Sequence, residues 1–435
     1  MTTGSGRTVV IGAGLSGLAC AVTLAEAGRE VLVFEAGDAV GGRVRTDEAT
    51  SPEGTYLIDR GFQVLLTAYP EARKLLDYDR LDLRTFYAGA DVRLGGRMHR
   101  VANPWKHPLV AAKAFGSPVA TLGDKARLAE LYGVNRLTSI DALFAKPEAQ
   151  TITMLRSLGF AETTIDRFFR PFFGGVFFDR DLLTSSRMFE FVFRMFATGD
   201  TAVPARGMQR MPEQLAGRLS AGSIRLNTRV ANIEPLGTGV RIGLEGGEHV
   251  DAARVVLATE GDAAARLLGP LAGGRELNTG WVGTVTLAYA MALADRPTPD
   301  PILMLDGEGA GPVNHLVVAS NVAPSYAPQG RALVYANTAG VPAGDDATLD
   351  RAAREQLRGW FGQSVDRWQL VRAIRVERAL PDQRVIDARE RVAATPRAAS
   401  IREGVFLCGD HTCNASIDGA LKSGRLAGEA ILDGG

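Results

Sequence analysis

Hydrophobic and polar positions near the start of the chain follow two different periods. Residues 8–11 form an apolar, β-branched run, which is typical of a buried parallel strand. Residues 15–27 carry apolar side chains at helical spacing, and Gly28 follows at a position where glycine ends many helices. Residues 31–34 are a second apolar run, which Glu35 closes. This pattern predicts a strand, a helix and a second strand.

The period of residues 122–183 predicts a largely helical segment. Within it, a helix is expected over 163–169, which Pro171 and Gly174–Gly175 interrupt. A further helix is predicted over 185–197, with its apolar side chains on one face.

Phenylalanine is concentrated in the same region, where 11 of the 18 in the chain lie between residues 160 and 196. Such a cluster predicts an aromatic core in which a minority of the rings also lines a large apolar pocket. Residues 103–120 contain three prolines around a short apolar middle, and they predict either a lid or a contact with a membrane surface. The remaining pattern predicts a hairpin over 92–101, strands over 223–226, 230–233, 240–244, 254–259, 281–293, 302–305, 315–320 and 332–337, and helices over 211–219 and 350–361.

Three glycines join the first predicted strand to its helix: Gly12, Gly14 and Gly17 form a G-x-G-x-x-G motif. Gly12 permits the tight turn, the missing Cβ of Gly14 lets a pyrophosphate approach the backbone, and Gly17 lets helix and strand pack closely. The helix N-terminus then presents free N–H groups to the phosphates. Glu35 has the offset of a carboxylate that binds ribose hydroxyls, and its charge would repel a 2′-phosphate. The segment therefore predicts binding of FAD or NAD and excludes NADP.

A second glycine motif, at residues 307–311, leads to Pro312 and not to a helix. It is therefore interpreted as a turn. We expect one dinucleotide site, and no pyridine nucleotide in a Rossmann unit of its own.

Gly41, Gly42 and Arg43 follow the acidic residue at close range. A backbone nest and a fixed cation at that place can hold the same pyrophosphate from its other side. With this tail, the N-terminal segment resembles the FAD-binding segment of the flavin amine oxidase superfamily. That superfamily includes amine oxidases, protoporphyrinogen oxidases and phytoene desaturases.

Three later segments resemble the same superfamily. Residues 57–65 look like its D-x-G-x-H/Q segment, which passes close to the flavin. Val230 stands where the family contacts the adenine through its backbone. Residues 405–432 resemble the C-terminal FAD motif, in which Asp410 binds the ribitol or pyrophosphate region and the helix start stabilises charge on the reduced flavin. Motifs and resemblance together predict these cofactor-binding residues: Gly12, Gly14, Leu15, Ser16, Gly17, Glu35, Ala36, Gly42, Arg43, Gly61, Phe62, Gln63, Val230, Gly409, Asp410, Ile417 and Asp418.

The resemblance implies an α/β fold, with a Rossmann-type, glutathione-reductase-like FAD-binding domain and an inserted α+β substrate domain. The length of 435 residues also favours two domains. The expected FAD-binding domain comprises residues 1–75, 204–275 and 400–435, and the expected substrate domain comprises 76–203 and 276–399.

The composition limits the classes of function and the cellular compartments that fit this sequence. The net charge is zero, with 49 basic and 49 acidic residues, which gives no electrostatic argument for binding nucleic acid. Three cysteines make neither a disulfide framework nor a zinc site, and they fit buried thiols in a reducing cytoplasm. We found no signal peptide pattern and no apolar run that could span a bilayer. We expect a cytoplasmic protein without a metal, with peripheral membrane contact as an alternative.

The substrate is predicted from departures from the amine oxidase pattern. Those enzymes place aromatic residues around the amine shortly before the C-terminal motif, whereas no aromatic residue lies between Trp368 and Phe406. The same stretch has no cysteine, which implies non-covalent FAD. Residues 375–381 and the phenylalanine-rich segment look more like the desaturase branch. We expect hydride transfer from an apolar, isoprenoid or carotenoid-like substrate to flavin N5, with oxygen or a quinone as the electron acceptor.

Other functions remain open at this stage. The alternatives are an amine or protoporphyrinogen-type oxidase that uses oxygen, a flavin-assisted isomerase, and a flavoprotein without turnover. No residue stands out as a catalytic acid or base, so the catalytic residues are unknown.

Overall fold

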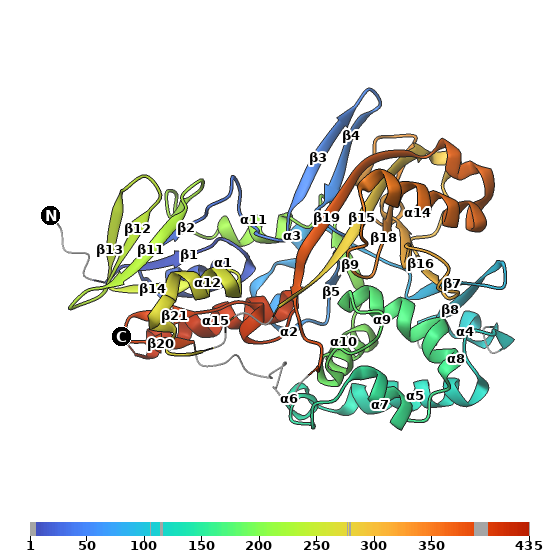
Figure 1. The fold of residues 1–435 in the computed structure, drawn as a ribbon, viewed down its shortest axis with the longest axis horizontal. Coiled ribbons are helices and arrows are strands. Elements are labelled where there is room, and N and C mark those ends of the chain that lie inside the picture. The colour runs from blue at the N-terminus through green and yellow to red at the C-terminus, as the bar shows by residue number, and fades with distance from the viewer. Residues whose placement is uncertain are drawn as a thin grey trace.

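The computed structural model describes residues 6–434 except 105, 114–115, 276, 278–279 and 387–398. Figure 1 shows two regions built around separate sheets, with the β3–β4 hairpin projecting between them. A mixed α/β architecture is confirmed, since helices cover both sheets.

The first sheet combines strands from distant parts of the chain, in the order β10-β2-β1-β14-β21-β20. All neighbouring strands are parallel except β20 and β21. A three-stranded antiparallel sheet, β11-β12-β13, lies beside it (Figure 1). The strand bounds are β1 Thr8–Ile11, β2 Val31–Phe34, β10 Ile224–Arg225, β11 Val230–Pro235, β12 Val240–Leu244, β13 His249–Ala252, β14 Arg254–Leu257, β20 Ser400–Arg402 and β21 Val405–Leu407.

Two helices pack closely next to this sheet: α1 (Leu15–Glu26) and α15 (Ile417–Asp433). A Cβ atom on Gly424 would overlap the carbonyl oxygen of Ser16, so only glycine allows this approach of the two helices. The hydroxyl oxygens of Ser16 and Ser423 are 3.2 Å apart at the same contact. The two ends of the chain are therefore joined in one core.

The second sheet has seven strands in the order β19-β15-β18-β17-β16-β7-β8. One face packs against α14 (Asp346–Phe361), and the other faces a layer of helices (Figure 1). The strand bounds are β7 Gly89–Leu94, β8 Arg97–Ala102, β15 Trp281–Ala292, β16 Leu303–Asp306, β17 His315–Val318, β18 Arg331–Asn337 and β19 Gln369–Pro381. The apolar runs of this region therefore form strands, as the sequence pattern predicted.

The helical layer differs from the prediction at Pro171 and Gly174–Gly175, which do not interrupt the helix. A π-helical turn, Ile165–Phe169, continues directly into α9 (Arg170–Phe177). Proline is tolerated there because the π-helical turn just before it shifts the backbone hydrogen bonds to i→i−5, which relieves the conflict that proline causes in a regular helix. The glycines allow close packing, since a Cβ on Gly175 would lie 2.6 Å from Nδ1 of His315. The other helices of the layer are α5 Leu122–Leu137, α6 Ile140–Phe144, α7 Thr151–Ser157, α8 Glu162–Thr164 and α10 Ser186–Thr198.

Phenylalanine rings fill the space inside this layer. The ring of Phe173 is fully buried, and its centroid lies 4.4 Å from that of Phe189. It also contacts Phe169, Phe172, Phe177, Phe193 and Phe196. The expected aromatic core is confirmed, whereas the cavity described below is lined by other residues.

Smaller elements connect the two sheets. A hairpin is formed by β3 and β4, and β9 pairs with both β5 and β6. The bounds are β3 Thr46–Ser51, β4 Gly54–Asp59, β5 Leu65–Leu66, β6 Leu83–Thr85, β9 Thr201–Pro204, α2 Pro70–Leu75, α3 Tyr78–Leu81, α4 Pro108–Lys113, α11 Arg210–Ala216, α12 Gly261–Leu268 and α13 Ala319–Val322.

Several predicted bounds differ from the structure by a few residues, and two of the differences have a visible cause. The helix predicted over 350–361 begins at Asp346, because the Asp345 side chain accepts a hydrogen bond from the Thr348 backbone and caps it. The strand predicted over 315–320 ends at Val318, where the chain turns into α13.

The segment 103–120, predicted to be a lid or a membrane contact, contains α4, but residues 105, 114 and 115 lie outside the described residues. Its role therefore stays a prediction. Among the residues that the structure describes, no helix combines the length and apolar character needed to cross a bilayer.

Candidate functional site

The glycine turn between β1 and α1 has the geometry of a phosphate cradle. Gly12 has φ +107°, and a Cβ there would lie 2.7 Å from the carbonyl oxygen of Ala258. A Cβ on Gly17 would overlap the carbonyl oxygen of Gly12. At Gly14, the N-cap of α1, the position of a Cβ is open, with no atom of the described chain within 4 Å. Two glycines thus serve the packing of the protein, and the third leaves the helix N-terminus accessible to a ligand.

Glu35 is fixed beside this turn. Its Oε2 atom accepts a hydrogen bond from the Ala13 backbone N–H at 2.8 Å, and Oε1 accepts one from Gly37 at 2.7 Å. The carboxylate therefore lies at the edge of the glycine turn, at the end of β2. Ala36 is the next residue along the chain.

The second glycine pair lies directly against the first. The Gly41 backbone N–H donates to the Ala13 carbonyl at 2.8 Å, and Gly14 and Gly41 form an isolated β-bridge. A Cβ on Gly42 would be 3.4 Å from the Cα atom of Gly14. The glycine turn before α1 and the glycine pair after β2 therefore form one surface, although α1 and β2 lie between them in the sequence.

Arg43 and Asp410 form an ion pair that joins the N-terminal and C-terminal motifs. Nη2 of Arg43 donates to both carboxylate oxygens, at 2.7 and 2.8 Å, while Nη1 donates to the Ala379 carbonyl at 2.8 Å. The guanidinium also lies over the Trp281 ring, 5.5 Å from its centroid. Sequence reasoning missed Trp281, because a tryptophan that opens a buried strand has the same pattern as a core residue.

The segment of Gly61, Phe62 and Gln63 is held between the two sheets. The Phe62 backbone N–H donates to the Thr286 hydroxyl at 3.2 Å. Nε2 of Gln63 donates to the Arg43 carbonyl at 2.8 Å. The predicted flavin segment is thus tied to the predicted pyrophosphate segment on one side and to β15 on the other.

Asp418 has a contact that the sequence did not predict. Its Oδ1 atom accepts a hydrogen bond from the Glu71 backbone N–H at 2.7 Å, so the carboxylate caps α2. Burial raises the pKa of Asp418 to about 6. The start of α15 is capped instead by Ser416, whose hydroxyl accepts from the Gly419 N–H at 3.0 Å. A cofactor contact at residues 417–418 would therefore come from the backbone.

The remaining predicted residues lie on or next to three different elements. Leu15 and Ser16 are buried in the first turn of α1, Val230 begins β11, and Gly409 follows β21. Gly409 donates its backbone N–H to the Ser423 hydroxyl at 3.0 Å.

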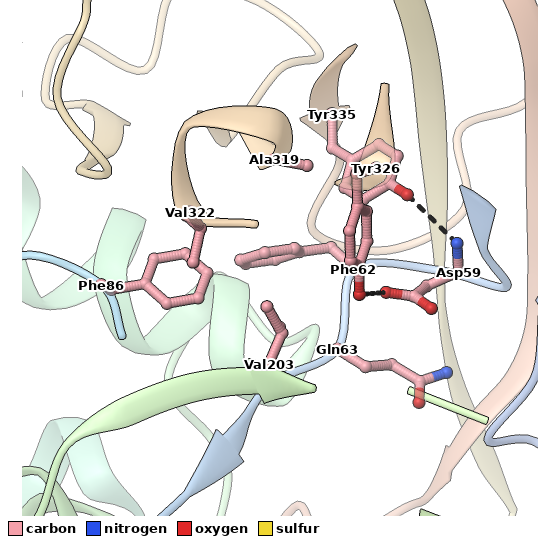
Figure 2. Close-up of a pocket in the computed structure, with 9 residues that line it drawn as sticks. All are labelled: Asp59, Phe62, Gln63, Phe86, Val203, Ala319, Val322, Tyr326 and Tyr335. Carbon is pink, nitrogen blue, oxygen red and sulfur yellow. Dashed lines mark hydrogen bonds between the residues drawn. The ribbon is translucent and has the colours of Figure 1, made fainter. Parts of the chain in front are cut away.

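A small cavity borders Phe62 and Gln63 (Figure 2). Its volume is about 10 Å³, the room that one water molecule needs. Figure 2 shows the Phe62 ring pointing toward Phe86, with the Tyr326 hydroxyl on the Asp59 carboxylate. The lining residues are Asp59, Phe62, Gln63, Phe86, Val203, Ala319, Val322, Tyr326 and Tyr335.

A wider cleft opens next to this cavity, with a volume of about 490 Å³. It is lined by Asp82, Arg84, Ala205, Arg206, Pro324 and Ser325. Arg84 of the cleft and Val203 of the cavity are register partners in the β6–β9 pair. Residues directly opposite each other point to one face, so the two hollows adjoin on the same side of this sheet.

Asp59 is a buried carboxylate whose oxygens are all used. Oδ1 accepts hydrogen bonds from the Thr46 hydroxyl at 2.5 Å and the Met208 N–H at 3.0 Å, and Oδ2 accepts one from Tyr326 at 2.7 Å. The Asp59 N–H donates to the Tyr335 hydroxyl at 3.1 Å. Burial raises the pKa of Asp59 to about 6, against the opposing effect of these hydrogen bonds.

We expect the Asp59→Asn variant to lose part of the pH dependence of stability. The folded pKa lies above the unfolded value, so folding binds a proton between about pH 4 and pH 6, and stability falls as pH rises through that window. From pH 5 to pH 7 this group should remove about 1 kcal/mol from the free energy of unfolding. Urea unfolding of both proteins at the two pH values measures the difference. An equal change in wild type and variant would contradict the assignment.

Comparison with known proteins places these features in one family. Residues 15–432 match the sequence profile described as flavin containing amine oxidoreductase. A phytoene dehydrogenase of Streptomyces griseus is 28% identical over 304 residues, which are 60% of this chain and 56% of that protein. A possible lysine-specific histone demethylase 1 of Drosophila melanogaster is 42% identical over 71 residues, 16% of this chain and 8% of that protein. These matches span less than two thirds of either relative.

Solved structures share the fold over nearly the whole chain. A putative protoporphyrinogen oxidase from an Exiguobacterium species has a TM-score of 0.73 at 18% identity and covers 99% of both chains. Cyclohexylamine oxidase from Brevibacterium oxydans has a TM-score of 0.69 at 18% identity, again over 99% of both chains. The match over residues 15–432 shows that the chain belongs to the flavin containing amine oxidoreductase family, a family of FAD-dependent oxidoreductases.

Proposed function

We propose that the protein removes hydride from an apolar, isoprenoid or carotenoid-like substrate. The observation that carries this proposal is the lining of the cavity at Phe62. Five of its side chains are apolar, and the Asp59 carboxylate accepts three hydrogen bonds from the protein. A cationic amine would need a free carboxylate or carbonyl oxygen at this place to compensate its charge. An apolar chain needs only an apolar surface from which water is excluded.

We also propose how the chain holds FAD. The pyrophosphate lies at Gly14 and the N-terminus of α1, with Gly42 beside it, and Glu35 binds a ribose. The six-stranded sheet is then the Rossmann-type domain, with the boundaries expected from the sequence. All three cysteines are buried, which supports non-covalent binding. Bound FAD supplies the hydride acceptor at its N5 atom.

In this proposal the protein positions the substrate and excludes water from the cavity. Gly61 and Phe62 are fixed by the Thr286 hydroxyl, and Phe86 and Val322 close the cavity with apolar surface. Because the cavity has room for about one water, a substrate must displace part of this wall. The adjoining cleft has the size of a ligand pocket and is the entrance in this proposal.

A second candidate is an amine or protoporphyrinogen oxidase that uses oxygen. The observation in its favour is the shared fold with the putative protoporphyrinogen oxidase and with cyclohexylamine oxidase. Against an amine, no aromatic residue stands between Trp368 and Phe406. In either case, oxygen or a quinone is the electron acceptor that reoxidises FAD.

Anaerobic mixing of the FAD-loaded protein with matched panels tests the proposal. The panels are amines, porphyrinogens and detergent-solubilised polyenes, and loss of flavin absorbance is recorded. We expect reduction by polyenes only, and a slower reduction in Val322→Ile, whose additional methylene group fills the cavity. Dithionite should reduce both proteins equally, which controls for intact flavin.

Reduction by an amine or a porphyrinogen would support the second candidate and overturn the first. No reduction by any panel would leave an isomerase or a flavoprotein without turnover, which analysis of polyene products separates.

A further inference from the structure

Two buried N–H donors lie side by side on the second sheet, and neither finds an acceptor in the part of the chain that the structure describes. They are Nδ2 of Asn337 on β18 and Nε2 of His315 on β17. The two residues are register partners, and they are 1% and 3% exposed. A buried donor without an acceptor costs about 1–3 kcal/mol, so a neighbouring pair indicates a site for a ligand.

The Asn337 amide is oriented by a chain of hydrogen bonds. The Phe62 N–H donates to Thr286 Oγ1 at 3.2 Å, and the Thr286 hydroxyl donates to Asn337 Oδ1 at 2.7 Å. Since Oδ1 is the accepting atom, Nδ2 is left with its hydrogens free to donate. The donor is thus held in place by the same backbone atom that positions the predicted flavin segment.

The His315 ring is oriented by its neighbour. Nδ2 of Asn314 donates to the Pro171 carbonyl at 2.7 Å and lies 3.2 Å from Nδ1 of His315. Because Nδ1 faces this N–H group, it accepts, and the proton of the neutral ring sits on Nε2. Burial lowers the pKa of His315 to about 4, so the ring is uncharged at neutral pH.

The donor pair lies next to the small cavity. The Phe62 ring, which lines the cavity, is 5.3 Å from the His315 ring between centroids. Tyr335, which also lines it, is two positions before Asn337 on β18 and therefore shares its face of the sheet. Tyr335 of the cavity and Asn337 are therefore two residues apart on one face of β18, and the Phe62 ring, which lines the cavity, packs against His315.

We propose that Asn337 and His315 bind an uncharged acceptor oxygen, a carbonyl or a hydroxyl, carried by an otherwise apolar substrate. The Phe62 ring moves aside when this oxygen binds. Two neutral donors repel a cationic amine and compensate a carboxylate poorly, so they select a neutral oxygen. The inference rests on the proposed function, because it names the substrate class of the same site.

The test compares two C20 polyenes that differ only in one oxygen. Retinol carries a hydroxyl, and axerophthene is the matching hydrocarbon. Both are titrated anaerobically in detergent into the FAD-loaded protein after dithionite reduction, so that no hydride can be transferred, and the dissociation constant is read from the change in polyene absorbance. We expect wild type to bind retinol at least tenfold more tightly than axerophthene, and the ratio to fall to about one in Asn337→Leu and in His315→Phe.

A control variant separates this site from general effects on the sheet. Tyr289→Phe removes a hydrogen bond to Asp350 of 2.7 Å on the face toward α14. It should leave the retinol-to-axerophthene ratio unchanged. Either donor variant alone is sufficient for the test if the other fails to fold.

Three outcomes would overturn the inference. Equal binding of both polyenes by wild type rejects the donor pair while leaving the proposed function standing. A change of FAD retention or flavin absorbance in the donor variants without a polyene shows that the flavin itself is the acceptor. Binding of neither polyene rejects the apolar substrate class together with the donor site.

Discussion

Gly14→Val should leave the protein folded while lowering its affinity for FAD at least a hundredfold, about 2.7 kcal/mol. The backbone at Gly14 has φ −73° and ψ 176°, which valine adopts without strain, and a Cβ there meets no atom of the described chain. The side chain would instead fill the space in front of the α1 N-terminus, where the pyrophosphate is proposed to lie.

The measurement is the FAD content after purification, followed by titration of the apoprotein with FAD. Gly133→Val is the matched control, since Gly133 also has open space at the Cβ position and lies in α5, away from the glycine turn. It should keep its FAD. A Gly14→Val protein with full FAD content would show that the nucleotide binds elsewhere.

Arg43→Ala should lower the free energy of unfolding by about 3 kcal/mol. The variant leaves the Asp410 carboxylate, which is 7% exposed, without its partner, and it leaves the Ala379 carbonyl without its donor. Removing one member of a buried pair costs far more than the pair itself contributes, because the remaining charge is not solvated.

Urea unfolding of the FAD-free proteins at pH 7 measures this loss, because bound FAD would add a difference in FAD affinity to the difference in stability. The control is Arg241→Ala, whose ion pair with Asp251 is exposed and should contribute nothing measurable. Arg43→Ala,Asp410→Ala should recover part of the lost stability, because no charge remains buried. A single variant as stable as wild type would mean that water already reaches Asp410.

The strand, glycine turn and helix at residues 8–26 could be predicted because their requirements are local. Gly12 and Gly17 are needed for contacts within one turn and one neighbouring strand, so spacing along the chain identifies them. The same reasoning was wrong at Pro171, where the π-helical turn before it removes the conflict that proline usually causes. The rule that proline ends a helix considers proline alone and not the conformation of the turn before it.

Other features depend on contacts that the sequence order hides. Asp418 caps α2 by accepting a hydrogen bond from the N–H of Glu71, which lies 347 positions earlier in the chain, and no pattern around Asp418 predicts this contact. His315 lies in an apolar run, where a histidine usually has all its hydrogen bonds. Only the three-dimensional arrangement shows that its Nε2 has no acceptor in the described chain, and that Asn337 stands opposite.

The contact between α1 and α15 has a consequence for biosynthesis. Ser16 and Ser423 meet although 407 positions separate them. At a translation rate of 5–20 residues per second, α1 waits roughly 20–80 s on the ribosome before its partner helix exists. During that time α1 has no α15 to pack against, and β14, the strand that pairs with β1, has no β21. We expect newly made chains to depend on chaperones until the last helix emerges.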